Sequence, residues 1–233
     1  MSIAGIWQKA ARRTPQELAF IAYSRGRDRA TLASYRLRYP RVKFGTGVSI
    51  QGKLIVRGQG QVTIGDYVGI TGTLIIDASG EVTIGNNCGF GCYRHQINRI
   101  DSRQPAARVV IGPLSFFNGA HVTAWTTIEF KKNCIVSDAL IEDSDYHSIE
   151  INRWDPAAPV KSFPISVGEN VWIGSRAAVL KGVTIGNNSV VGLGTIVRKS
   201  VPENCVVIGN PQQIVKELDP SIAAYERLSH QTG

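Results

Sequence analysis

One acidic segment of the chain carries the residue types that general acid–base catalysis needs. It reads Asp-Ser-Asp-Tyr-His and ends at His147, with carboxylates at Asp143 and Asp145. A carboxylate that holds one imidazole nitrogen leaves the other free to take a proton near neutral pH. The segment therefore predicts a general base at His147, held by Asp143, Asp145 or a backbone carbonyl. The structural alternative is a surface histidine in an acidic loop.

The other histidines and the cysteines lack the spacing of a metal site. His95, His121 and His147 follow one another at intervals of 26 residues, without a close pair. Cys88 and Cys92 are four residues apart, but no second pair completes a zinc site. The N-terminus has no apolar run of signal-peptide length, which predicts a cytoplasmic protein with reduced, structural thiols. We therefore expect no metal.

A six-residue period in the sequence indicates the structural scaffold that must position these groups. Aliphatic residues recur every six positions through the last third of the chain, at Val167, Ile173, Val179, Ile185, Val191 and Val197. The same phase occurs earlier with interruptions, at Phe44, Ile50, Val56, Ile64, Ile70, Ile76, Ile84, Phe90, Ile111, Phe117, Thr123, Phe130 and Val136. Such a period fits neither an α-helix nor an ordinary strand. It predicts an all-β coil with a short strand and a tight corner every six residues, three sides to a turn, whose inward residues stack into one core.

Two stretches interrupt the period, and both are predicted to be loops. They are the basic segment 92–108 and the segment 143–164, which contains His147 and three prolines. Loops inserted into a rigid scaffold commonly carry function. We therefore expect a coil domain over residues 44–211 with loops at 92–108 and 143–164. It is flanked by a partly helical segment 1–43 and by short helices over 212–233.

The positive charge of the chain is concentrated at its N-terminus. Residues 1–43 hold ten Lys or Arg against two acidic residues, so their net charge of +8 equals that of the whole chain of 233 residues. A basic segment can bind nucleic acid, anionic lipid or an acidic glycan, or can be a solvated cap. Of these, we predict peripheral contact with an anionic membrane and no nucleic-acid partner.

Residues 162–211, which contain SFPI, NVWIGS and the closing GNP, closely resemble the C-terminal coils of hexapeptide-repeat acetyltransferases. The resemblance is to the galactoside and maltose acetyltransferases and the polysaccharide O-acetyltransferases related to them, and it extends back through His147. It implies a left-handed parallel β-helix, a homotrimer with active sites between subunits, and acetyl-CoA as co-substrate. It further implies that His147 deprotonates a saccharide hydroxyl as that oxygen attacks the thioester.

The resemblance also implies which residues hold the two substrates. Coenzyme A would contact Ser175, Gly192, Leu193, Gly194, Arg198, Lys199 and Lys216, and the acceptor would contact Asn118, Trp172 and Arg153. The chain departs from the family where Gln212 and Gln213 replace a basic residue, and at Ala124–Thr126, where a carboxylate is usual. The expected function is O-acetylation of a surface-polysaccharide precursor. The alternatives are N-acetylation of an amino or nucleotide sugar, a non-catalytic scaffold, and a zinc enzyme similar to γ-class carbonic anhydrases.

Overall fold

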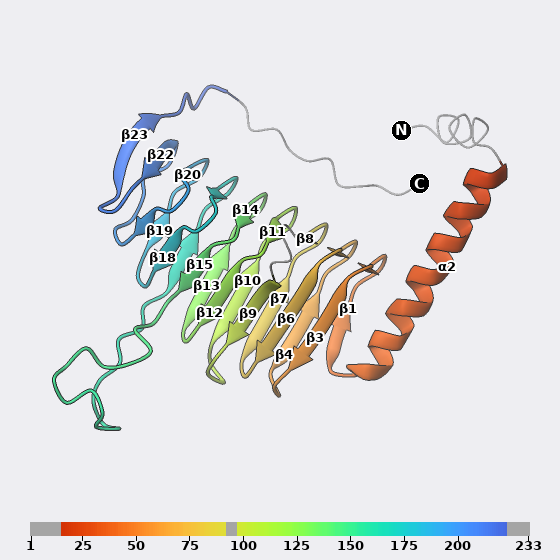
Figure 1. The fold of residues 1–233 in the computed structure, drawn as a ribbon, viewed down its shortest axis with the longest axis horizontal. Coiled ribbons are helices and arrows are strands. Elements are labelled where there is room, and N and C mark those ends of the chain that lie inside the picture. The colour runs from red at the N-terminus through yellow and green to blue at the C-terminus, as the bar shows by residue number, and fades with distance from the viewer. Residues whose placement is uncertain (1–14, 92–96, 223–233) are drawn as a thin grey trace.

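The structure is a computed structural model that describes residues 15–91 and 97–222. Short strands follow one another around a three-sided coil, so that successive turns stack along the long axis of the molecule (Figure 1). Strands in successive turns pair in parallel. The all-β coil predicted from the six-residue period is therefore confirmed, as is the parallel β-helix that the resemblance implies.

The described strands form three sheets, one for each side of the coil. Sheet A contains β1 (Val42–Phe44), β4 (Gln61–Ile64), β7 (Glu81–Ile84), β10 (Arg108–Ile111), β13 (Thr127–Phe130), β16 (Ile165–Val167) and β19 (Thr184–Ile185). Sheet B contains β2 (Ser49–Ile50), β5 (Gly69–Ile70), β8 (Gly89–Gly91), β11 (Phe116–Asn118), β14 (Ile135–Ser137), β17 (Trp172–Ile173), β20 (Val190–Val191), β22 (Cys205–Ile208) and β23 (Gln213–Glu217). Sheet C contains β3 (Lys53–Arg57), β6 (Thr73–Ala78), β9 (Ile97–Ser102), β12 (His121–Ala124), β15 (Leu140–Glu142), β18 (Ala178–Leu180) and β21 (Ile196–Val197).

The core is a set of aliphatic rows that run along the inside of the coil. All six periodic residues of the C-terminal turns have no exposed surface, namely Val167, Ile173, Val179, Ile185, Val191 and Val197. Each stacks on its counterpart one turn away, as Val167 does on Ile185. Burial of one such side chain stabilises the fold by about 1.5–3 kcal/mol.

The predicted phase is wrong at Thr123. The inward residue of β12 is Val122, which pairs with Ile100 and Ile141, whereas Thr123 pairs with Asp101 and Glu142 on the outside. The corner between β11 and β12 is one residue shorter than its C-terminal equivalents, because the inward Val122 is five positions after Phe117, whereas Val179 is six positions after Ile173. Such a change of corner length inverts every side chain of the following strand.

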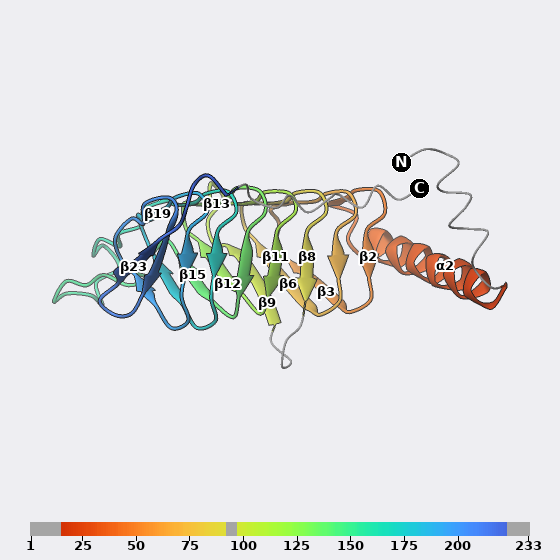
Figure 2. The same ribbon diagram turned by 90° about the horizontal axis from the view of Figure 1, so that it is seen from above.

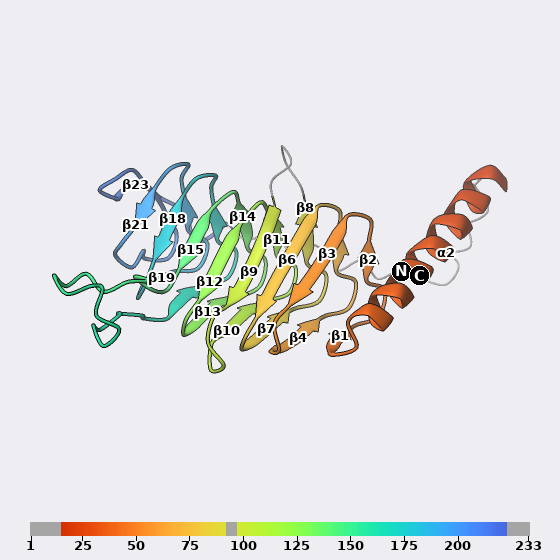
Figure 3. The same cartoon turned by 60° about the horizontal axis from the view of Figure 1, so that its bottom comes forward.

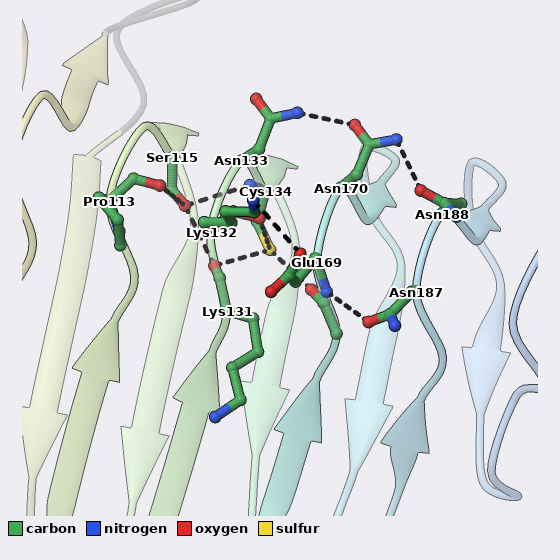
Figure 4. Close-up of polar contacts among 11 residues, drawn as sticks. Pro113, Ser115, Lys131, Lys132, Asn133, Cys134, Glu169, Asn170, Asn187 and Asn188 are labelled. Atoms are coloured by element: carbon green, nitrogen blue, oxygen red, sulfur yellow. Dashed lines mark hydrogen bonds and ion pairs between the residues drawn. The ribbon is translucent and has the colours of Figure 1, made fainter. Parts of the chain in front are cut away.

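Asparagines at one corner of the coil join successive turns (Figure 4). The amide of Asn133 donates to Asn170 at 2.8 Å, and that of Asn170 donates to Asn188 at 3.0 Å. All three have a positive φ, which asparagine tolerates better than most residues. Beside this row the side chain of Asn187 accepts the backbone N–H of Glu169 at 2.8 Å. This row of asparagines links successive turns and fixes their spacing.

The predicted loop at 92–108 is shorter in the structure, because residues 97–102 form β9 in sheet C. The inward positions of β9 are Asn98, Ile100 and Ser102, and the two polar residues conceal the aliphatic period. Asn98 replaces the missing apolar contact with hydrogen bonds. Its amide donates to the Gly91 carbonyl at 2.7 Å, and its oxygen accepts the backbone N–H of Gly119 at 2.8 Å.

The N-terminal segment contains a helix, α2 (Pro15–Arg38), whose C-terminal part caps the first turn of the coil. Leu32 is largely buried, and the Arg36 guanidinium donates to the Phe44 and Gly45 carbonyls at 3.3 Å each. The helix projects beyond the end of the coil, as Figure 2 shows. Within the described residues, α2 lacks the apolar length to cross a membrane.

The C-terminal prediction is wrong for its first helix. Residues 213–217 form β23, which pairs antiparallel with β22. The unpaired edge of β22 offers backbone hydrogen bonds that outweigh the weak helical pattern of Ile214, Val215 and Leu218. The predicted second helix falls mostly on residues 223–233, outside the described residues.

Candidate active site

The segment 143–164 leaves the coil between β15 and β16 and projects from it as a long loop (Figure 1). Asp143 stands at its base and has no exposed surface. Its carboxylate accepts the backbone N–H groups of Trp125 and Thr126 at 2.7 and 2.8 Å, and the Thr126 hydroxyl at 2.7 Å. Asp143 therefore ties the loop to the turn that follows β12.

Two further contacts close the base of the loop. The Ser162 hydroxyl donates to the Ser144 hydroxyl at 2.9 Å, which joins the outgoing and returning chain. Asp145 forms an ion pair with Lys181, which lies on the turn after β18. Lys181 is 36 residues away from Asp145, and no feature of the sequence marks it as a partner of the loop.

His147 follows directly on this closed base and is exposed. Its backbone N–H donates to the Asp145 carbonyl at 2.7 Å. Both carboxylates expected to hold the imidazole have other partners, because Asp143 binds the Trp125–Thr126 turn and Asp145 binds Lys181. The two acids therefore fix the backbone on which His147 stands.

A small cluster of aromatic and acidic residues lies beside the candidate base. The Tyr146 hydroxyl donates to Glu142 at 3.2 Å, and its ring meets Trp125 edge-on, with the centroids 5.8 Å apart. Burial raises the pKa of Glu142, and the Tyr146 hydrogen bond and nearby His121 oppose that shift. Burial likewise raises the pKa of Tyr146. The sequence analysis did not single out Glu142 or Tyr146, although Tyr146 lies within the acidic segment and Glu142 directly precedes it.

The first residues expected to hold coenzyme A meet at the corner between sheets B and C. The Gly194 N–H donates to the Ser175 carbonyl at 2.9 Å, and Leu193 between the two glycines is 74% exposed. A Cβ at Gly192 would lie 2.6 Å from the Ile208 side chain, and Gly194 has a φ of +70° with open space beside it. The structure therefore brings Ser175, Gly192, Leu193 and Gly194 together on a narrow, accessible edge.

The basic pair Arg198 and Lys199 lies at the next corner, exposed and held by Gln212. The Gln212 side chain accepts both backbone N–H groups at 2.7 and 3.0 Å and donates to the Lys199 carbonyl at 2.9 Å. Gln212 thus fixes the backbone of a basic turn. Beside it is a shallow hollow lined by Lys199, Ser200, Val201, Pro202, Val207, Gln212 and Ile214. Lys216 is exposed on β23.

The residues expected to contact the acceptor are not brought together with His147 in one chain. Asn118 and Trp172 lie on sheet B, where Trp172 is 51% exposed between Ile135 and Val190. Arg153 is exposed on the projecting loop. Sheet B and the corner from which the loop leaves, between sheets C and A, are different sides of the coil.

The candidate metal ligands are only partly placed. Residues 92–96, which include Cys92 and His95, lie outside the described part of the chain. Over residues 15–91 and 97–222 no three His, Cys, Asp or Glu side chains are grouped as metal ligands would be. Cys88, Cys134 and Cys205 are buried, and burial raises the pKa of the first two to about 11 and about 12. These thiols fill the core.

Comparison with known families and structures agrees with the fold. The hexapeptide repeat of succinyl-transferase matches residues 164–199. The polysialic acid O-acetyltransferase OatWY has a similar structure, with a TM-score of 0.54 at 21% identity, over 81% of this chain and 94% of that one. Residues 164–199 of this chain therefore match a hexapeptide repeat, within a fold that the chain shares with this acetyltransferase. The N-acyltransferase AntD from Bacillus cereus has the same fold, with a TM-score of 0.50 at 17% identity, over 80% of this chain and 89% of that one.

The sequence match to a curated relative covers part of this chain. Galactoside O-acetyltransferase from Escherichia coli (strain K12) is 52% identical over 58 residues, which are 25% of this chain. The chain spans 29% of the length of that relative. The similarity to galactoside acetyltransferases predicted from the sequence is therefore confirmed for this stretch.

Proposed function

We propose that the chain is an acetyl-CoA-dependent O-acetyltransferase that acts on a saccharide hydroxyl, with His147 as general base. The observation that carries the proposal is the closed loop base, which presents an exposed imidazole beside a cluster of polar side chains. The match to galactoside O-acetyltransferase supports the same chemistry. A surface-polysaccharide precursor is the acceptor class we favour.

In this mechanism His147 takes the proton of the acceptor hydroxyl while the oxygen attacks the thioester carbon. The carbon–sulfur bond then breaks, the acetyl group remains on the sugar oxygen, and the proton passes to the coenzyme A sulfur. No acyl-enzyme is formed, which agrees with the burial of Cys88, Cys134 and Cys205. A positioned base typically contributes about 10²–10⁴-fold to the rate. Because Asp143 and Asp145 have other partners, a backbone carbonyl or a neighbouring subunit would orient the ring.

Coenzyme A would lie along the edge of the C-terminal turns. Gly194, which has open space beside it, leaves room for the thin pantetheine arm beside Ser175. Arg198, Lys199 and Lys216 would bind the phosphates, since cations on a rigid backbone are well suited to them. The Gln212 clamp supports this assignment because it holds the Arg198–Lys199 turn in place.

We further propose a homotrimer, in which a second subunit brings Asn118 and Trp172 to the loop that carries His147. The projecting loop has the exposed apolar side chains that such contact would cover, with Ile151 99% and Trp154 90% exposed. Sedimentation should give about three times the 25.3 kDa of one chain. A stable monomer at micromolar concentration would contradict both the trimer and the shared site.

The function is tested by acetyl transfer from acetyl-CoA to a panel of glycans, measured as thiol release and as mass gain of the glycan. We expect an alkali-labile ester on a hydroxyl, and binding of coenzyme A alone in a titration. An alkali-stable amide would assign the chain to N-acylation instead. A chain that binds no coenzyme A would be a scaffold, and the proposal would fail.

A further inference from the structure

The outer face of sheet C carries a row of polar side chains that the mechanism above does not use. The row crosses five strands in register, and Figure 3 shows this side of the coil. It comprises Arg57, Asp77, Asp101, Thr123 and Glu142. The neighbouring inward row is apolar and buried, with Ile76, Ile100, Val122 and Ile141. Side chains of the outer row therefore point away from the core, yet two of them, Asp101 and Thr123, are only 5% and 6% exposed.

Asp101 has one carboxylate oxygen with a partner and one without. Its Oδ2 accepts a charge-assisted hydrogen bond from Arg99 Nε at 2.8 Å. Its Oδ1 is buried and has no hydrogen-bond partner among the described residues. A buried carboxylate oxygen without a donor is costly, so native proteins rarely leave one. Asp101 Oδ1 therefore lacks a hydrogen-bond donor.

Trp125, which directly follows β12, lacks a hydrogen-bond acceptor rather than a donor. Its indole Nε1 is buried and has no acceptor among the described residues. The indole packs edge-on against Tyr146, whose hydroxyl donates to Glu142. Thr123 is the register partner of both Asp101 and Glu142, and Trp125 follows Thr123 by two residues, so the unpaired donor and the unpaired acceptor belong to adjacent turns of the coil.

A hydroxyl group supplies what both atoms lack, because its O–H donates and its lone pairs accept. A saccharide offers several adjacent hydroxyls and an apolar ring face for which Trp125 and Tyr146 provide a wall. Tyr146 contacts Trp125 and Glu142, so it must shift to admit the sugar. His147 follows Tyr146 directly in the chain, which places a sugar bound here next to the candidate base.

We propose that the sheet C surface, defined by Asp101, Thr123, Trp125, Glu142 and Tyr146, binds the acceptor saccharide through its hydroxyl groups. The proposal rests on the transferase function proposed above and places the acceptor on a different side of the coil from Asn118 and Trp172. It accounts for Arg99 as well, which bonds Asp101 and lies 3.8 Å from Asp77, and so holds the carboxylates in place.

The test is binding of the full chain to immobilised glycans without coenzyme A, with a parallel titration of coenzyme A. The variants are Asp101→Asn and Glu142→Gln, which keep size and remove charge. Glu81→Gln is the matched control, because Glu81 is an outward glutamate on sheet A, paired with Arg108 at 3.1 Å. We expect the first two variants to bind the glycan roughly tenfold more weakly, as for loss of one hydrogen bond to a charged group. Glu81→Gln should match the wild type, and coenzyme A should bind all proteins equally.

Equal glycan binding by the wild type and both sheet C variants would overturn the proposal that the sheet C surface binds the acceptor. A chain that binds coenzyme A but none of the glycans would overturn it too, and both results leave the transferase proposal standing. If the wild-type chain does not bind coenzyme A, the proposed transferase function fails instead, whatever the glycan binding shows. If Asp101→Asn does not fold, Tyr146→Phe replaces it, since it removes only the hydroxyl that bonds Glu142. If only Trp172→Ala bound the glycan more weakly, the acceptor site would be assigned to sheet B instead.

Discussion

The C-terminal turns and the central turns of the same coil differ in how they use their side chains. From Val167 to Val197 every sixth residue is a buried aliphatic, and the outward positions of sheet C are apolar, as at Leu180. In the central turns Asn98 points inward, and the outward row of sheet C carries acids. Regular turns make a rigid edge for a ligand, whereas irregular turns place polar groups where chemistry can use them.

The most direct test of this difference is a substitution that gives a central turn the regular apolar pattern of inward residues. Asn98→Leu would match Leu74, its neighbour in the same row. The backbone groups of Gly91, Gly119 and Ala120 would then lose their partner. Each buried group left unpaired costs about 1–3 kcal/mol, so we expect a loss of several kcal/mol in the free energy of unfolding. Denaturant unfolding measures it, with Asn152→Ala on the exposed loop as control. An Asn98→Leu protein as stable as the wild type would show that the irregularity is incidental.

The second prediction concerns the buried acid at the loop base. Asp143→Ala removes three hydrogen bonds from the Trp125–Thr126 turn and should lower the free energy of unfolding by about 3 kcal/mol. Asp143→Asn should lose less, because its amide oxygen still accepts. Thermal unfolding of both variants decides the matter, with Asp155→Ala on the exposed loop as the comparison. If Asp143→Ala keeps its stability and loses only activity, the carboxylate acts on His147 and not on the turn.

The third prediction concerns the ion pair that joins the loop to the regular turns. Lys181→Met keeps the alkyl chain but frees Asp145, whose carbonyl holds the His147 backbone. The pair is partly exposed, so stability should change by less than about 1 kcal/mol. Misplacement of the base should lower kcat by roughly 10–100-fold, with KM for acetyl-CoA unchanged. The double variant Lys181→Met, Asp145→Asn should lose no more than either single variant. Additive losses would show that the two side chains act separately.

The smallest expected effect is a pH dependence at Glu142. Burial raises the pKa of this carboxyl, so the folded protein binds its proton more tightly than the unfolded chain does. The charge therefore costs stability above the folded pKa, and the cost disappears as the pH falls through it. We expect Glu142→Gln to melt slightly higher than wild type at pH 7 and the difference to close toward pH 4. A difference in Tm that does not change with pH would exclude this account.

The sequence predicted the regular turns better than the irregular ones, for a physical reason. The six-residue period is a direct record of burial, so Val167 to Val197 could be placed from the pattern alone. Thr123 was misplaced because the short corner after Phe117 shifts the phase by one residue. β9 was missed because Asn98 and Ser102 satisfy their polar groups inside the coil. β23 depends on the free edge of β22, which no local pattern records.

The candidate site likewise has one part that could be predicted from the sequence and another that could not. Residues of the regular edge, such as Ser175 and Gly194, lie together in the structure. The orienting role of Asp143 and Asp145 could not be judged from sequence, because their partners Thr126 and Lys181 are distant along the chain. The unpaired Asp101 and Trp125 atoms are visible only in three dimensions.

The central claim is tested most directly by the kinetics of His147→Ala on an accepted glycan. Loss of a positioned base should lower kcat by about 10²–10⁴-fold. KM for acetyl-CoA should change little, because the imidazole acts on the acceptor hydroxyl. His95→Ala and His121→Ala should be much milder. Equal losses from all three substitutions would indicate a metal site, and a fully active His147→Ala enzyme would contradict the mechanism.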